Sequence, residues 1–97
     1  MPAIEYSQQA LDDITRLVDF LIEQDTNAAL ATFDIIENGI TLLELHPEIG
    51  RPVPDSSVRK LVISRGKTGY IALYEFIESL DKVLILAIRH QREVGFD

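Results

Sequence analysis

The order of its hydrophobic patterns is the feature that most constrains how this chain folds. In the first half, apolar residues recur every three or four positions, which is the period of a helix with one buried face. The second half instead contains short runs of branched and aromatic residues separated by turns. This order predicts two helices followed by a group of β-strands.

Two amphipathic helices are expected, over residues 7–24 and 27–45. Ser7 is a suitable N-cap for the first helix, and Pro47 ends the second, because the residue before a proline avoids the helical conformation. Gly39 costs the second helix about 1 kcal/mol relative to alanine, so it is expected to mark a close approach to another element. The stripes expected to be buried are Leu11, Ile14, Leu17, Val18, Leu21 and Ile22 in the first helix, and Ala29, Phe33, Ile36, Ile40 and Leu43 in the second.

Strands are expected at residues 3–6, 58–64, 70–77 and 82–89, with 46–57 as a stiff, proline-containing loop. Connections as short as those in the second half require antiparallel neighbours. The fold class is therefore α+β: an N-terminal strand and an antiparallel two-helix hairpin packed on a small, mainly antiparallel sheet. Residues 1–97 form one domain, because a chain of this length supplies a single core.

Several functional classes are excluded or disfavoured. The sequence has no cysteine, so disulfides, thiolate metal sites and a cysteine nucleophile are absent. Gly66 and Gly69 join two strands, which favours a hairpin turn over a phosphate-binding loop. His46 and His90 lack metal-ligand spacing, and we expect neither a metal nor a cofactor. No apolar run is long enough to span a membrane and no signal peptide is recognisable, so a cytoplasmic location is expected.

The net charge of −7 is unevenly distributed along the chain. Residues 1–50 contain ten acidic residues and one basic residue, Arg16, whereas residues 51–97 contain eight basic and six acidic residues. The acidic pair Asp12 and Asp13 is expected on a solvated helix face. A total charge of this sign argues against nucleic acid as a partner. The second half nevertheless has a basic stretch, containing Arg51, Arg59, Lys60, Arg65 and Lys67.

A polar cluster follows the last expected strand, at residues 89–93 (RHQRE). Two arginines beside a histidine could bind a phosphate group, and the histidine could act as a general acid or base. The same cluster could equally be a polar rim whose charges pair with one another, for example Arg92 with Glu93 or with Glu75. The residue pattern leaves both interpretations open.

In combination, these features resemble the RelE/ParE superfamily of toxins from type II toxin–antitoxin modules. The matching residues are Ser7, Ala10, Asp13 and Ile14 after the opening strand; Leu43, Pro47, Gly50, Arg51 and Pro52; Val58, Arg59 and Leu61; residues 69–74 (GYIALY); and residues 83–93 (VLILAIRHQRE). The resemblance implies a growth-inhibiting toxin of a plasmid-stabilisation module, neutralised by an antitoxin whose C-terminal segment wraps it. Leu73 and other strand residues facing away from the helices are candidates for antitoxin contact.

The resemblance also implies two possible targets. RelE-like members cleave messenger RNA on the ribosome without a metal, whereas ParE-like members act on DNA gyrase. RelE-like nucleases commonly have arginine where this sequence has Ile71, and the net charge is negative. Both features favour the ParE-like branch, in which the toxin is not an enzyme. A ribosome-dependent endoribonuclease, or a decayed toxin that only binds its antitoxin and regulates the operon, remain the alternatives.

The candidate site residues follow from this resemblance and from the positions of the cations. If the chain is a nuclease, the catalytic candidates are Arg65, Arg89, His90 and Arg92. The residues expected to bind the target, whether gyrase or ribosome and messenger RNA, are Arg51, Arg59, Arg65, Lys67, Arg89, His90 and Arg92.

Overall fold

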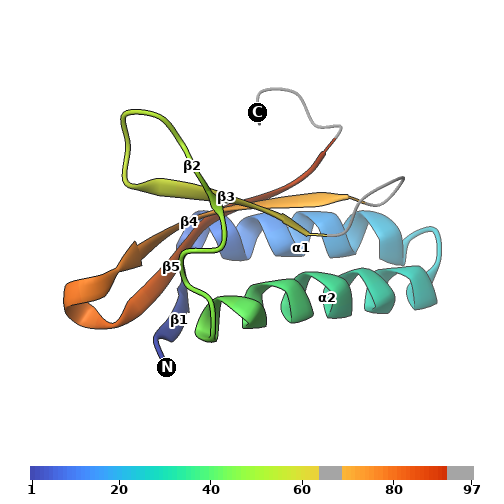
Figure 1. The fold of residues 1–97 in the computed structure, drawn as a ribbon. Coiled ribbons are helices and arrows are strands. Elements are labelled where there is room, and N and C mark those ends of the chain that lie inside the picture. Colours follow the sequence, from blue (N-terminus) through green and yellow to red (C-terminus); the bar gives the residue numbers. More distant parts are fainter. Residues whose placement is uncertain (64–68, 92–97) are drawn as a thin grey trace.

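Two helices pack on one face of a five-stranded sheet in the computed structural model, which describes residues 1–63 and 69–91 (Figure 1). The α+β fold expected from the sequence is confirmed. The helices and strands are β1 (Ala3–Tyr6), α1 (Gln8–Ile22), α2 (Thr26–Thr41), the 3-10 turn η1 (Leu42–Glu44), β2 (Arg51–Pro52), β3 (Val58–Ile63), β4 (Tyr70–Ile77), the 3-10 turn η2 (Glu78–Leu80) and β5 (Lys82–His90).

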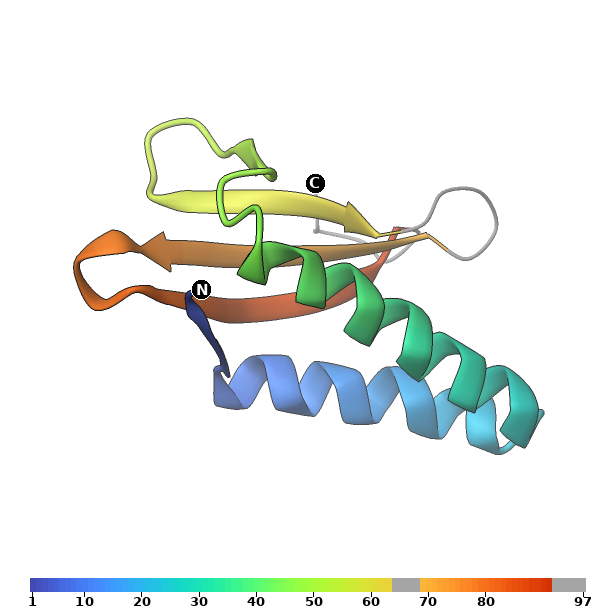
Figure 2. The same cartoon turned by 60° about the horizontal axis from the view of Figure 1, so that its bottom comes forward.

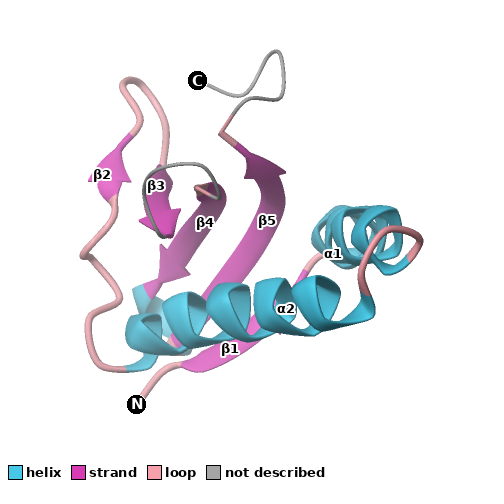
Figure 3. Ribbon diagram, turned by 90° about the vertical axis from the view of Figure 1, so that its right-hand side faces the viewer, coloured by secondary structure: helices cyan, strands magenta, loops and turns pink. Residues whose placement is uncertain are grey.

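The strands are arranged in the order β1-β5-β4-β3-β2. The first strand pairs in parallel with the last, with Ala3 opposite Lys82, and the other neighbours are antiparallel (Figure 3). The strand β2 lies within the segment that we expected to be wholly irregular, and it occupies the sheet edge, where a proline is tolerated. The expectation for residues 46–57 was therefore wrong at Arg51 and Pro52.

The helix boundaries follow the capping residues. The Oγ of Ser7 accepts a hydrogen bond from the N–H of Ala10 at 3.0 Å, which confirms Ser7 as the N-cap of α1. Asp25 caps α2 in the same way, through the N–H groups of Asn27 and Ala28. Regular α-helix ends at Thr41, earlier than expected, because the last turn tightens into the 3-10 turn η1.

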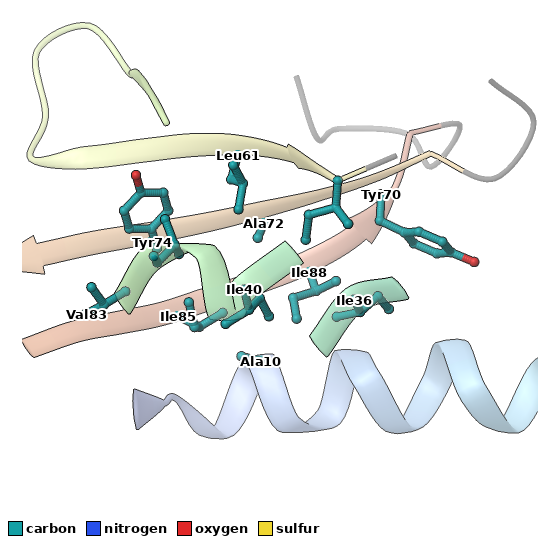
Figure 4. Packing of buried hydrophobic residues seen from close by; sticks show 12 residues of the cluster. Ala10, Ile36, Ile40, Leu61, Tyr70, Ala72, Tyr74, Val83, Ile85 and Ile88 are labelled. Atoms are coloured by element: carbon teal, nitrogen blue, oxygen red, sulfur yellow. The ribbon is translucent and has the colours of Figure 1, made fainter. Parts of the chain in front are cut away.

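The main core lies between α2 and the covered face of the sheet (Figure 4). Ile36 and Ile40 of α2 are buried, as are Ala72 and Tyr74 on β4 and Ile88 on β5. Gly39 of α2 packs against Ile63 of β3. A Cβ added to Gly39 would stand 2.7 Å from Cγ2 of Ile63 and 2.9 Å from its Cγ1. The close approach expected at Gly39 is therefore confirmed.

The expected buried stripes were wrong at three positions. Leu11, Ile22 and Phe33 are exposed, whereas Ala10 and Asp13 are buried. The helices lie side by side and antiparallel (Figure 2), so each has one face toward the sheet and a second toward its neighbour. The apolar periodicity of each helix includes residues of both faces. It does not show which of these residues are buried and which stay exposed to solvent.

Candidate functional site

Asp13 forms a hydrogen bond with the part of β5 that lacks a second partner strand, because β1 pairs only with residues 82–85. Beyond β1, helix α1 lies along β5 (Figure 2), and side chains of Ser7 and α1 make the hydrogen bonds that a neighbouring strand would make. The Oγ of Ser7 donates to the carbonyl of Leu86 at 2.9 Å, and Oδ2 of Asp13 accepts from the N–H of Ile88 at 2.9 Å. The side chain of Asp13 is fully buried, so the expectation of a solvated carboxylate was wrong here.

The second oxygen of Asp13 binds one side chain of β5 and two side chains of α1. Its Oδ1 accepts from Nη1 of Arg89 at 2.6 Å, from Nη1 of Arg16 at 2.7 Å and from the amide of Gln9 at 2.9 Å. Burial by itself raises the pKa of this carboxyl, but the hydrogen bonds from Ile88, Arg16 and Gln9 and the charge of Arg89 outweigh it. The pKa of Asp13 therefore lies below its ordinary value. Asp13 thus joins α1 to the end of β5, the strand that contains Arg89 and His90.

The loop before β2 is fixed by two residues of the sheet. The guanidinium of Arg59 donates to the carbonyls of Glu48 and Gly50 at 3.0 and 2.9 Å, and lies 3.5 Å from the Glu48 carboxylate. The N–H of Gly50 donates to the buried hydroxyl of Tyr74 at 2.8 Å. Burial raises the pKa of the Tyr74 hydroxyl, and the Gly50 N–H and the Arg59 charge only partly oppose this shift. Arg59 thus holds the loop in place, and its role in target binding stays a prediction.

Replacing Tyr74 by phenylalanine is expected to destabilise the fold by about 1–2 kcal/mol, because the buried N–H of Gly50 loses its acceptor. Tyr70→Phe is the matched control: the Tyr70 hydroxyl makes a longer contact, 3.3 Å, with the hydroxyl of Thr32. Urea unfolding of both variants measures the difference. Equal losses of unfolding free energy in the two variants would show that the hydrogen bond between Gly50 and Tyr74 adds no specific stability.

The face of the sheet away from the helices is mainly apolar at its centre. Alternate residues of a strand point to opposite faces, and Leu61, Tyr70, Ala72 and Tyr74 are part of the helix-covered core. Their neighbours therefore form the opposite surface, here called the open face. Its apolar members are Val62 on β3, Ile71 and Leu73 on β4, and Leu84 and Ala87 on β5.

Cations flank this apolar centre. Arg51 lies directly opposite Lys60 in the β2–β3 pair, so the two are cross-strand neighbours on one face. Lys60 was absent from our target-binding set, and only the strand register places it beside Arg51. On the other side, Arg89 is paired in register with Ile71.

The structure separates Arg89 from His90. Adjacent strand residues point to opposite faces. Arg89 reaches Asp13 at the strand edge, whereas the ring of His90 meets that of Tyr70 edge to face, with centroids 5.4 Å apart. The two side chains therefore do not converge on one point. The other members of the predicted sets, Arg65, Lys67 and Arg92, lie outside the described residues.

Within residues 1–63 and 69–91, no helix combines the length and the apolar content needed to cross a membrane. In the same part of the chain, no three histidine or acidic side chains gather closely enough to hold a metal ion.

The model of the ParE toxin family, from type II toxin–antitoxin systems of the parDE kind, matches residues 4–95. The chain belongs to this family. The toxin is also 31% identical over 93 residues to Toxin RelE3 of Caulobacter vibrioides, a match that covers 96% of this chain and 98% of that one. It is thus a toxin of a type II toxin–antitoxin system.

Solved structures share the toxin's fold. A chain of the chromosomal ParDE system from P. aeruginosa matches with a TM-score of 0.76 at 20% identity, covering 93% of this toxin and 96% of that chain. A chain of the E. coli RelBE toxin–antitoxin complex matches with a TM-score of 0.65 at 15% identity, covering 96% and 100%. Both branches of the superfamily therefore share the arrangement of helices and sheet seen here.

Proposed function

We propose that this toxin inhibits growth by binding DNA gyrase in the cytoplasm, without chemistry of its own. The observation that carries the proposal is the composition of the open face. Its centre is apolar. The exposed Val62 lies opposite Ile71 of the middle strand, whose side chain is 9% exposed and occupies the position where RelE-like nucleases commonly have arginine. A cation at that position would stabilise the charge that develops on a phosphate during cleavage. An apolar surface flanked by Arg51 and Lys60 is better suited to a protein partner.

The positions of Arg89 and His90 support the same proposal. Phosphodiester cleavage by an acid–base pair requires groups that reach one scissile phosphate together. Here the Arg89 guanidinium is held on Asp13, and the His90 ring lies against Tyr70 on the other face of the strand.

We further propose that a cognate antitoxin neutralises the toxin. The similar solved structures described above come from the ParDE toxin–antitoxin system and from the RelBE toxin–antitoxin complex. The open face offers Val62 and Leu73 as apolar contacts, and an exposed apolar surface of this kind commonly marks a protein-binding site.

The gyrase proposal predicts that toxin released from its antitoxin inhibits supercoiling by purified DNA gyrase at a small molar excess. Val62→Glu is expected to abolish the inhibition, because it places a charge in the apolar centre of the open face. Leu45→Glu is the matched control, since Leu45 is an exposed apolar residue outside the sheet. Supercoiling is read on agarose gels, and antitoxin added in equimolar amount is expected to restore it.

A lack of effect on gyrase at high excess would overturn the proposal. Primer extension on translated messages then tests the endoribonuclease alternative, which the name of the relative Toxin RelE3 favours. New cleavage sites that disappear in His90→Ala would identify a nuclease. A chain that neither inhibits growth nor produces such sites would be a decayed toxin.

A further inference from the structure

A second apolar surface lies between the two helices, separate from the open face. It is a groove of about 340 Å³ between α1 and α2, beside Tyr6 at the end of β1. Its lining includes Leu11, Ile14 and Thr15 from α1, and Phe33, Ile36 and Glu37 from α2. Leu11 and Phe33 are 46% and 43% exposed, which makes them large apolar side chains left uncovered at the groove.

The rim of this groove is acidic. Glu37 is one helical turn from Phe33 and lines the groove itself. On α1, Asp12 is next to Leu11, and Asp19 is one turn beyond Thr15. These carboxylates are exposed. The charge of Glu37 reaches Tyr6 in the groove: burial and the negative charge of Glu37 both raise the pKa of the Tyr6 hydroxyl.

Arg16 is the only basic residue among the first fifty residues. The guanidinium of Arg16 is bound to the buried carboxylate of Asp13, on the side of α1 that faces β5. The groove and the open face thus present opposite signs of charge, since the open face is flanked by Arg51 and Lys60. Two surfaces of opposite charge select chemically different partner segments.

We propose that this groove receives a segment of the antitoxin in which apolar side chains are flanked by lysine or arginine. The inference rests on the proposed neutralisation by an antitoxin and specifies its chemistry. The groove offers the antitoxin an apolar contact on the helical side, in addition to the open face of the sheet. The apolar side chains pack on Leu11 and Phe33, and the flanking cations approach Asp12 and Glu37.

A second copy of the toxin is disfavoured in this groove. In a two-fold symmetric dimer the same surface meets itself, so the carboxylates of one rim would face those of the other. Like charges placed together across an interface oppose association. A basic partner segment relieves this repulsion, whereas a second toxin chain increases it.

The test measures the affinity of the full toxin for the protein encoded by the adjacent reading frame, by isothermal titration calorimetry. Phe33→Ala and Leu11→Ala are each expected to weaken binding about tenfold or more, as for anchor residues of an interface. The controls make the same changes elsewhere: Phe20→Ala, at a side chain that is 65% exposed, and Leu42→Ala, at one that is 48% exposed. Leu42 lines another groove, between α2 and β3. We expect both controls to bind like the unaltered toxin.

Charge is tested by the double variant Asp12→Lys, Glu37→Lys, with Glu78→Lys in the turn η2 as control. The double variant is expected to bind about tenfold more weakly at low salt, and the difference should shrink as ionic strength rises. Circular dichroism melts identify variants that lose the fold, and light scattering reports the oligomeric state of the free toxin.

The outcomes are distinguishable. A complex that forms equally well with the groove variants overturns the inference and leaves antitoxin binding intact. If Leu42→Ala weakens antitoxin binding and Leu11→Ala does not, the antitoxin occupies the groove between α2 and β3. That result also overturns the inference. A toxin dimer that Phe33→Ala dissolves would show a second copy as the occupant. Absence of any complex rejects the proposed neutralisation itself, and this inference with it.

Discussion

Asp13→Ala is expected to destabilise the toxin by about 2–4 kcal/mol, because it leaves the buried N–H of Ile88 without its acceptor and removes the charge-assisted hydrogen bonds from Arg16 and Arg89. The neighbouring substitution Asp12→Ala is the control. Asp12 is exposed and accepts one hydrogen bond, from Gln8 in the same helix, so its loss should cost less than about 0.5 kcal/mol. Denaturant unfolding near neutral pH measures both values.

The same carboxylate predicts how stability depends on pH. The folded-state pKa of Asp13 is lowered from its ordinary value of 3.8, so the ionised form is favoured by folding. Its contribution is complete above the unfolded-state pKa and is lost as the pH falls through the lower, folded-state pKa. The difference in unfolding free energy between the unaltered toxin and Asp13→Ala should therefore shrink in acid. A difference that stayed constant down to about pH 2 would contradict this role.

Gly39→Ala is expected to lower the free energy of unfolding when residue 63 is isoleucine, and to raise it when residue 63 is alanine. In the unaltered toxin the added methyl group meets both γ-carbons of Ile63 at less than 3 Å, and a β-branched side chain on a strand has little freedom to move away. The overlap should cost about 3 kcal/mol, against which the helix gains about 1 kcal/mol from alanine. The net expectation is a loss of about 2 kcal/mol.

In the Ile63→Ala background the same substitution should stabilise the fold by about 1 kcal/mol, because the overlapping atoms are gone and only the gain in helix propensity remains. The coupling between the two sites is therefore about 3 kcal/mol, and a double-mutant cycle from urea unfolding measures it. Equal effects of Gly39→Ala in both backgrounds would show that the contact with Ile63 is not what requires glycine.

Local signals in the sequence were sufficient for most of the fold. Ser7 was recognisable as a cap because it precedes the first apolar period, and Gly39 because glycine inside a helix has a cost. Asp13 was missed because charge normally marks a solvated face. Its location depends on the free edge of β5, a partner 75 residues away in the chain. The spacing of Ala10 and Asp13 on one side of α1 was the available signal, since a small residue one turn away permits close packing.

The candidate site was less predictable for the same reason. The neighbours Arg51 and Lys60 come together through the pairing of β2 with β3, and β2 has no apolar alternation that would identify it as a strand. Arg89 and His90 are adjacent in the sequence, yet strand geometry sends their side chains to opposite faces. The second apolar face of the helices, around Leu11 and Phe33, was visible as periodicity but was assigned to the core. Whether a face is covered depends on tertiary packing.

The pairing of the first strand with the last also bears on when the toxin becomes complete during its synthesis. The strand β1 has β5 as its neighbour in the sheet, and the hydrogen bond from Ser7 to Leu86 spans 79 residues. Such contacts form only after the ribosome has made the chain as far as Leu86, at roughly 5–20 residues per second. The helical hairpin emerges first but has no sheet to pack on until β3, β4 and β5 follow. A growing chain that lacks β5 therefore has neither the complete sheet nor the partner of Asp13, and does not yet have the fold of the toxin.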